Sequence, residues 1–512
     1  MNLVDLIGGH PADARALHDG KDWITWGALR ERVAVTAAGL AHLRLGPDDR
    51  VAVVWPTSAE FVVAYLAVLA IGAVAVPLNP NSPASELERE LRTVTPAAIL
   101  AGGPALVNVA ALHAGTPGLG TLVLEGGEGG SSWEAVSGRD RAAGAAGEAA
   151  APLAPAPRRE GDPAVLLFTS GTAGAPKAAV LSHGNLVANL HQMLAVPDEI
   201  IRADDVGLAA VPLFHIFGLN VALGLCLATG AGLVLEERFD APATLGLVRD
   251  LEVTLLLGAP AMFAAWSELG RAGEAPPEGL TSVRRAVSGA AALPAEVAAR
   301  FEDCFGVPLW QGYGLTEASP VVSTALGTGS NAAGSVGRPL PGVEVRLVDD
   351  HGQEVLEGDP GEIWVRGPNV FAGYWQDEAA TAEVLTGDGW LRTGDIAVLG
   401  GSGDLYVVDR KKDLVIVSGF NVFPAEVERC VAEVPGVAEA VVIGRPHPVS
   451  GETVEVVVVA SPGVDVSEAQ VKAHCVTRLA RYKCPTTVRF VAELPRGLTG
   501  KALRRALRDQ PA

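Results

Sequence analysis

The chain has few cysteines and a shortage of positive charge, and both features exclude classes of protein. Five of its 512 residues are cysteine, an odd number without metal-ligand spacing, so a reduced, cytoplasmic setting is the simplest interpretation. Lysine and arginine number 39 against 59 aspartates and glutamates, which gives a formal net charge of −20. Nucleic-acid binders usually show a basic face, so we expect no nucleic-acid partner.

Long apolar segments are also scarce. The N-terminus lacks the basic start and the long apolar core of a signal peptide. Residues 61–78 carry no charge, which reaches the lower limit for a membrane span, but Gly72 and Pro77 interrupt this stretch. We interpret it as a buried helix at about 57–71 that leads into a buried strand at about 74–78. We therefore expect no transmembrane segment, and the sequence leaves peripheral contact with a membrane open.

Apolar runs alternate with helical patterns along most of the chain. Such runs occupy residues 50–54, 74–78, 96–101, 207–211, 232–235 and 254–257. Strands separated by helices in this way predict parallel α/β sheets covered on both faces. Residues 342–408 change to short strands with Gly, Pro and Asp turns, which predicts a small antiparallel barrel or sheet. The predicted fold class is α/β, with two parallel α/β lobes and a small β-barrel followed by a small, mobile α+β module.

The length and the charge distribution together predict two domains. A chain of 512 residues exceeds what one hydrophobic core usually supports. From Asp409 onward there are 15 Lys or Arg and 12 Asp or Glu, a net charge of +3 that leaves −23 on the preceding residues. We predict an N-terminal domain of residues 1–408 and a smaller, basic C-terminal domain of residues 409–512.

A loop rich in glycine and hydroxyl groups follows the apolar run at residues 164–167. It reads Phe-Thr-Ser-Gly-Thr-Ala-Gly-Ala-Pro-Lys and ends at Lys177. Because glycine lets backbone amides approach anionic oxygens closely, the loop predicts polyphosphate binding, although a plain turn is the alternative. It is not the common P-loop, which needs Ser or Thr after the lysine. Here Ala178 begins what looks like a returning strand, so a magnesium ligand would have to come from elsewhere.

Further segments supply groups that this loop lacks. Residues 311–317 read Gln-Gly-Tyr-Gly-Leu-Thr-Glu. Tyr313 could cover a flat base, Thr316 could donate to a phosphate, and Glu317 is the hard oxygen ligand that Mg²⁺ prefers. Asp395 follows a Gly-containing turn and could accept hydrogen bonds from ribose hydroxyls, although a solvated turn is the commoner explanation. Lys501 lies on a Gly-containing loop close to the end of the chain.

In this order, these segments and the charged run at residues 409–413 resemble the adenylate-forming superfamily of acyl- and aryl-coenzyme A synthetases, insect luciferases and peptide-synthetase adenylation domains. The resemblance covers nearly the whole chain. It implies an AMP-forming acid–thiol ligase that uses ATP, Mg²⁺ and coenzyme A. A carboxylate would attack the α-phosphorus of ATP and release pyrophosphate, and a thiol would then take the acyl group from the adenylate and release AMP.

The resemblance also implies roles for individual residues. Thr316, Glu317 and Lys501 match catalytic positions, with Glu317 as the Mg²⁺ ligand, and Asp409 matches the hinge about which the C-terminal module rotates. The implied ATP and AMP contacts are Thr169, Ser170, Gly171, Thr172, Gly174, Lys177, Gly289, Ala290, Ala291, Gly312, Tyr313, Gly314, Asp395 and Arg410. The implied borders of the other substrates are Phe214, His215 and Phe217 for the acyl pocket, and Ser418 and Gly419 for the coenzyme A tunnel.

The chain departs from the family loop at two positions. Ala173 stands where Ser or Thr is usual, and Ala178 stands where Gly is usual. One side-chain phosphate donor is therefore missing, and we expect at most a modest loss of ATP affinity.

The sequence restricts the choice of substrate less than it restricts the type of reaction. Apolar residues near His215, among them Phe214 and Phe217, favour an aliphatic or aryl acid over an amino acid. The leading hypothesis is a coenzyme A ligase for medium- or long-chain fatty acids. The alternatives are an aryl ligase of the coumarate or benzoate kind, a stand-alone enzyme that loads a carrier protein, a luciferase-like oxygenase and a noncatalytic nucleotide-binding regulator. The sequence leaves the choice between a monomer and a homodimer open.

Overall fold

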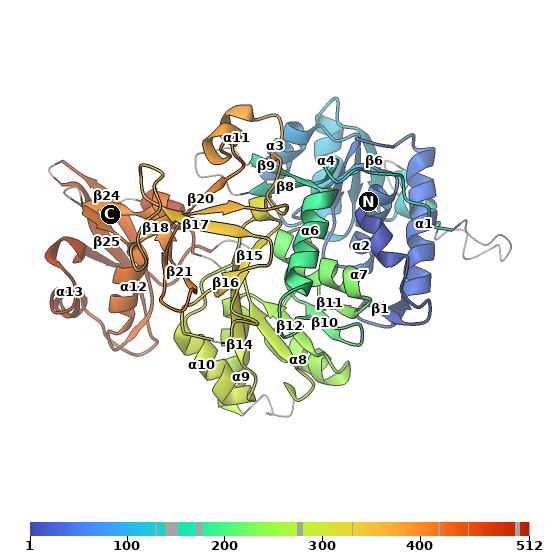
Figure 1. The fold of residues 1–512 in the computed structure, drawn as a ribbon. Coiled ribbons are helices and arrows are strands. Elements are labelled where there is room, and N and C mark those ends of the chain that lie inside the picture. The colour runs from blue at the N-terminus through green and yellow to red at the C-terminus, as the bar shows by residue number, and fades with distance from the viewer. Residues whose placement is uncertain are drawn as a thin grey trace. The chain divides into compact units, whose positions relative to one another are not determined.

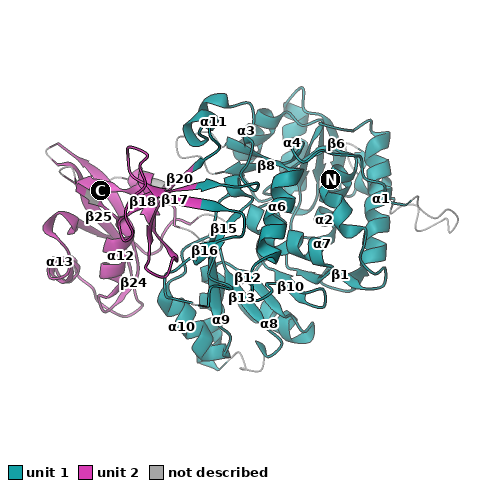
Figure 2. Ribbon diagram, in the orientation of Figure 1, with its two compact units in different colours: residues 1–344, 365–391 teal, residues 345–364, 392–512 magenta. Residues whose placement is uncertain are grey.

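The chain divides into two compact units (Figure 2). The larger unit contains Met1–Glu344 and Val365–Leu391, and the smaller contains Val345–Trp364 and Arg392–Ala512. The computed structural model describes residues 1–127, 131–138, 152–169, 177–273, 280–329, 331–417, 420–448, 450–496 and 502–510. Seven residues predicted to act in function lie outside these ranges, namely Ser170, Gly171, Thr172, Gly174, Ser418, Gly419 and Lys501.

The larger unit is built on two mixed sheets with helices packed against them (Figure 1). Within the described ranges, the first sheet has nine strands, in the spatial order β16 (Arg338–Pro339), β15 (Val321–Thr324), β14 (Leu309–Gly314), β13 (Arg285–Ser288), β12 (Leu255–Gly258), β10 (Val206–Ala209), β11 (Gly232–Leu235), β1 (Arg15–His18) and β2 (Trp23–Thr25). The strands from β14 to β1 run parallel, and antiparallel strands complete both edges. The predicted parallel α/β architecture is therefore confirmed, with antiparallel edges added.

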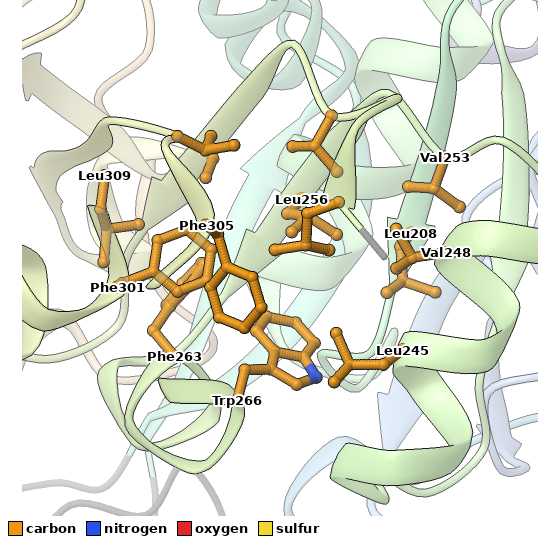
Figure 3. Packing of buried hydrophobic residues seen from close by; sticks show 14 of the residues in the cluster. Leu208, Leu245, Val248, Val253, Leu256, Phe263, Trp266, Phe301, Phe305 and Leu309 are labelled. Atoms are coloured by element: carbon orange, nitrogen blue, oxygen red, sulfur yellow. The ribbon is translucent and has the colours of Figure 1, made fainter. Parts of the chain in front are cut away.

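The core beneath this sheet is aromatic. Phe263 and Trp266 come from α9 (Pro260–Ala272), and Phe301 and Phe305 come from α10 (Ala295–Phe305). These rings pack edge-to-face or tilted against one another and fill the space below the apolar strands (Figure 3). The contact of Phe263 with Phe301 packs the two helices against each other within this core.

The second sheet has eight strands in the described part of the chain. Their order is β19 (Gly373–Tyr374), β9 (Lys177–Ser182), β8 (Pro163–Thr169), β4 (Val74–Leu78), β3 (Arg50–Val54), β5 (Ala98–Ala101), β6 (Thr121–Leu124) and β7 (Ser131–Ser132). From β8 to β7 the pairing is parallel, whereas β9 and β19 are antiparallel additions at one edge. The glycine-rich loop that the sequence predicts to bind polyphosphate connects β8 to β9 at this edge.

The remaining helices of the larger unit follow the predicted alternation. They are α1 (Trp26–His42), α2 (Ala59–Ala70), α3 (Ala84–Val94), α4 (Leu106–Gly115), α5 (Trp133–Val136), α6 (His183–Leu194), α7 (Leu225–Thr229), α8 (Ala241–Asp250) and α11 (Glu378–Val384). All positions of α2 except Glu60 are buried, so the uncharged stretch is a core helix followed by strand β4, as predicted. Among the described helices, none combines the length and the apolar character that crossing a membrane requires.

Among the described residues, two further sheets lie mostly in the smaller unit, although Glu344, Val365, Arg366 and Leu391 of their strands belong to the larger unit. The short strands expected at residues 342–408 form a four-stranded sheet of β17 (Glu344–Val348), β18 (Gly361–Arg366), β20 (Leu391–Leu399) and β21 (Leu405–Arg410). The second sheet contains β22 (Val415–Val417), β23 (Phe420–Val422), β24 (Val437–His447), β25 (Gly451–Ala460) and β26 (Thr487–Phe490). The helices are α12 (Pro424–Ala432), α13 (Glu468–Val476) and α14 (Arg504–Arg508). The boundary at residues 408 and 409 and the hinge stay predictions.

Candidate active site

The glycine-rich loop is anchored at both ends by the β8–β9 hairpin. Thr169 pairs with Lys177 in the antiparallel register, and the Thr169 hydroxyl lies 3.5 Å from the carbonyl oxygen of Lys177. The strand expected after the lysine is therefore present as β9, and it begins at Lys177 itself. This pairing fixes the backbone position of Lys177.

The side chain of Lys177 lies against an aromatic ring and an acid. Its Nζ is 5.2 Å from the ring centroid of Tyr374 in β19 and 3.8 Å from Oε2 of Glu383 in α11. A cation over an aromatic face is attracted by the ring quadrupole, with roughly 0.5–1 kcal/mol gained at exposed sites. Glu383 is 73% exposed, so its ion pair with the lysine is weak. The ammonium group can therefore exchange this partner for a stronger anion.

Glu317 contacts the hydroxyl of the same tyrosine. It lies in the short helix η5 (Thr316–Ala318), just after β14. Its Oε1 accepts a hydrogen bond of 2.7 Å from the hydroxyl of Tyr374, and its carbonyl oxygen accepts one of 2.8 Å from the amide of Phe371. Burial, with the negative charge of Glu317, raises the pKa of Tyr374, so the hydroxyl stays protonated and donates. The predicted metal ligand and the loop lysine thus share one neighbour.

Three asparagine side chains hold the turn that follows Glu317. Asn369 donates to the carbonyl of Ala318 at 2.9 Å, and Asn220 donates to that of Ser319 at 2.7 Å. Asn189 both donates to the carbonyl and accepts from the amide of Val321. Because these amide groups are buried, their hydrogen bonds fix the backbone that presents Glu317.

The predicted ATP and AMP contacts at residues 289–291 follow β13, and Gly289 packs against Phe217 of the predicted acyl pocket. A Cβ added to Gly289 would lie 2.9 Å from the ring of Phe217, so only glycine lets this ring approach the end of β13. Phe217 begins η3 (Phe217–Gly224), a π-helix, and such helices occur frequently at functional sites. His215, just before it, accepts a hydrogen bond from the amide of Phe217 at 3.3 Å. Burial lowers the pKa of His215, so the imidazole is neutral at pH 7.

Other predicted nucleotide contacts form a separate group in the smaller unit. Asp395 on β20 pairs with Arg410 on β21, and their side chains approach to 3.1 Å. The carboxylate of Asp409 accepts hydrogen bonds from the amides of Arg410 at 2.8 Å and Ala425 at 2.9 Å. The predicted hinge residue is thus tied to the first turn of α12.

Sequence reasoning missed Tyr374, Glu383 and the three asparagines. Tyr374 stands in a Phe-Ala-Gly-Tyr-Trp segment that is not among those predicted above to act in function, and the pairing of β19 with β9 brings it to Lys177. Of the predicted residues, the structure brings Lys177 and Glu317 to one tyrosine and Gly289 to Phe217. Within the described ranges, no cluster of three or more His, Cys, Asp or Glu side chains could hold a metal ion.

Comparison with known proteins identifies the family. A family model described as AMP-binding enzyme matches residues 7–375, and one described as AMP-binding enzyme C-terminal domain matches residues 426–501. The chain belongs to the AMP-binding enzymes. The first match spans more than half of the chain and includes both Lys177 and Glu317.

Several proteins similar to this AMP-binding enzyme are coenzyme A ligases or synthases. A feruloyl-CoA synthase of Amycolatopsis is 37% identical over 97% of this chain and 95% of its own length. A long-chain-fatty-acid–CoA ligase of Yersinia pestis is 42% identical over 68% of this chain and 62% of its own. The ATP-bound structure of MatB from Rhodopseudomonas palustris aligns with a TM-score of 0.90 at 32% identity, over 99% of this chain and 98% of that one.

Family, fold and relatives together define the reaction class. The predicted large α/β domain with a smaller C-terminal domain is confirmed, and so is membership of the adenylate-forming superfamily. This AMP-binding enzyme is an ATP-dependent, AMP-forming ligase that joins an acyl or aryl acid to coenzyme A.

Proposed function

We propose that this AMP-binding enzyme activates a carboxylic acid with a large apolar tail, first as an acyl-adenylate and then as a coenzyme A thioester. The observation that carries the proposal is the contact of both Lys177 and Glu317 with Tyr374. The Lys177 ammonium and the Glu317 carboxylate thus lie on either end of contacts with one side chain. A cation and a carboxylate this close together suit a bound nucleotide triphosphate and its counter-ion.

The chemistry needs fixed charges because both reactants are anions. A carboxylate oxygen forms a bond to the α-phosphorus of ATP, and the bond from that phosphorus to the bridging oxygen breaks as pyrophosphate leaves. Lys177 would hold the outer phosphates, and Lys501 would hold the carboxylate against the α-phosphate. The coenzyme A thiol then loses its proton as its sulfur bonds to the acyl carbon, and the bond from that carbon to the phosphate oxygen breaks as AMP leaves. Preorganised donors of this kind typically contribute about 10²–10³ in rate.

A single magnesium ion fits the donor set around Glu317. The described residues offer no cage of several carboxylates, but Mg²⁺ is commonly held by one or two carboxylates together with substrate phosphates. Glu317 would supply that carboxylate through Oε2, since Tyr374 engages Oε1. When bound, the ion would neutralise charge on the phosphate oxygens.

Two classes of tail have specific support. Every residue of η3 is buried and most are apolar, which suits the medium- or long-chain fatty acid that we place first, together with the 42% identity to a long-chain ligase. A ring-bearing acid is favoured by a feruloyl-CoA synthase that matches over 95% of its own length and by a 4-coumarate–CoA ligase-like protein of rice that matches over 81% of its own length. An aryl acid is therefore the second candidate.

A substrate panel tests the proposal. Pyrophosphate release is measured with acids from acetate to oleate, and with cinnamate, ferulate and benzoate, each with and without coenzyme A. We expect release that depends on an apolar acid, and thioester only when coenzyme A is present. Preference for ferulate over every fatty acid would replace the first candidate by the second. The absence of acid-dependent release with every member would contradict the proposed function.

A further inference from the structure

Tyr374 uses two parts of its side chain for two different partners. The hydroxyl donates to Oε1 of Glu317 at 2.7 Å, while the ring face lies 5.2 Å from Nζ of Lys177. The two partners belong to elements far apart in sequence, since Lys177 begins β9 and Glu317 lies in η5. A single side chain thus contacts both charged groups.

The backbone holds Tyr374 firmly between them. β19 pairs with β9 so that Tyr374 stands opposite Ala179, and the amide of Tyr374 donates to the Thr381 hydroxyl at 2.9 Å. The residue before it, Gly373, has a φ of 134° and allows no side chain, because a Cβ there would lie 2.7 Å from Thr381. The position of the ring is therefore determined by the fold and needs no ligand.

The same segment also fixes the backbone of the acid. The amide of Phe371 donates to the carbonyl oxygen of Glu317 at 2.8 Å, and the rings of Phe371 and Tyr374 meet edge-on at 5.0 Å. Residues 371–374 thus hold Glu317 by its main chain and by its side chain. Because Glu317 is already held by its main-chain carbonyl and by Oε1, it loses little further freedom when it binds a cation, which favours binding.

We propose that Tyr374 is a positioning residue for the nucleotide site: its hydroxyl orients Glu317 so that the second carboxylate oxygen can bind the cation of Mg·ATP, and its ring holds Lys177 beside the loop. This inference rests on the proposed function and adds a residue to it. Glu383, the exposed partner of Lys177, would give way to the phosphates when the nucleotide binds.

The test measures equilibrium binding of a non-hydrolysable ATP analogue by calorimetry, over a range of Mg²⁺ concentrations. Tyr374→Phe removes the hydroxyl and keeps the ring. We expect it to weaken binding in saturating Mg²⁺ by about 10- to 100-fold, the usual effect of losing a hydrogen bond to a charged group, and to leave Mg²⁺-free binding within about twofold of wild type. Tyr374→Leu also removes the ring and should weaken Mg²⁺-free binding as well. Tyr406→Phe, on β21, is the matched control and should change neither.

A double-mutant cycle separates positioning from a general loss of structure. In a Glu317→Gln background, Tyr374→Phe should have little further effect on Mg²⁺-dependent binding, because the two residues act as a unit. Two results would contradict the role of Tyr374: losses of binding that add up in the double variant, or a Tyr374→Phe variant that keeps the wild-type Mg²⁺ dependence. In either case acid-dependent pyrophosphate release by the wild-type enzyme would continue. Loss of the proposed function is distinguishable, since the wild-type enzyme would then release no pyrophosphate with any acid.

Discussion

At the scale of single residues, burial shifts the pKa values of several titratable groups. His183 is fully buried, its Nδ1 accepts the amide of Leu3 at 3.0 Å, and its Nε2 has no hydrogen-bond partner. Burial, reinforced by the positive charge of Arg158, lowers the pKa of His183 to about 4. Glu90 shows the opposite behaviour, because burial raises its pKa to about 7. The two groups therefore change stability with pH in opposite directions.

His183 gives a prediction with a definite sign. The folded enzyme keeps this imidazole neutral, whereas the unfolded chain protonates it below its ordinary pKa of 6.5. Stability should therefore fall as pH drops from 6.5 towards 4, by up to about 3 kcal/mol. Denaturant unfolding at several pH values should show a smaller loss in His183→Asn than in wild type. Because Glu90 acts oppositely over this range, the effect of His183 is measured as the difference in stability between wild type and His183→Asn at each pH. Equal pH profiles of the two proteins would contradict the low pKa of His183.

Single residues also show which parts of the candidate site could be predicted from the sequence. Glu317 and Lys177 were predicted because motifs carry them, and the structure brings both to one tyrosine. Tyr374 was not predicted, because its place depends on a two-residue strand that forms only by pairing with β9. Likewise, the contact of Phe217 with Gly289 joins segments about 70 residues apart in the chain and has no local signal.

At the scale of elements, strands could be predicted from the sequence where burial on both faces alone determined the residue pattern. The strand at residues 50–54 and the strand at 74–78 were predicted with their observed bounds, because fully buried parallel strands read as continuous apolar runs. The antiparallel edges and the π-helix at η3 were not predicted. They depend on tertiary pairing and on the local packing of Phe217, which periodicity does not report.

The elements of the smaller unit are joined by a buried charge cluster. Arg504 in α14 contacts both carboxylate oxygens of Glu428 in α12 at 2.8 Å, Asp413 at 3.4 Å and Asp409 at 3.5 Å. Burial raises the pKa values of Asp409 and Glu428, so their charged forms depend on this arginine. The cluster ties α14 to α12 and to the end of β21.

Arg504→Met tests this cluster. Removing the arginine leaves three carboxylates without their shared partner, and breaking a buried ion pair typically costs about 3–5 kcal/mol. The unfolding transition of the smaller unit should move to lower denaturant accordingly. Arg478→Met is the matched control, because its ion pair with Glu433 is about half exposed and should contribute less than about 1 kcal/mol. Equal effects of the two substitutions would contradict a structural role for the cluster.

At the scale of the whole molecule, charge is divided unequally between the parts of the chain. The residues from Asp409 onward carry a net charge of +3, and the rest carry −23. A basic module that brings Lys501 to an anionic substrate is consistent with this division, and rotation about Asp409 stays a prediction. The structure adds the local arrangement of residues within each unit. Lys177, Tyr374 and Glu317 lie together in the larger unit, and Asp395 and Arg410 lie together in the smaller one.

The most direct test of the central claim is acid-dependent exchange of labelled pyrophosphate into ATP, measured for wild type, Lys501→Ala and the matched control Lys472→Ala. Exchange reports formation of the acyl-adenylate without the thioester step. We predict exchange only when an apolar acid is present, a loss of about 10²- to 10³-fold in Lys501→Ala with an unchanged melting temperature, and wild-type rates in Lys472→Ala. Exchange that needs no acid, or that continues at the wild-type rate in Lys501→Ala, would contradict the account.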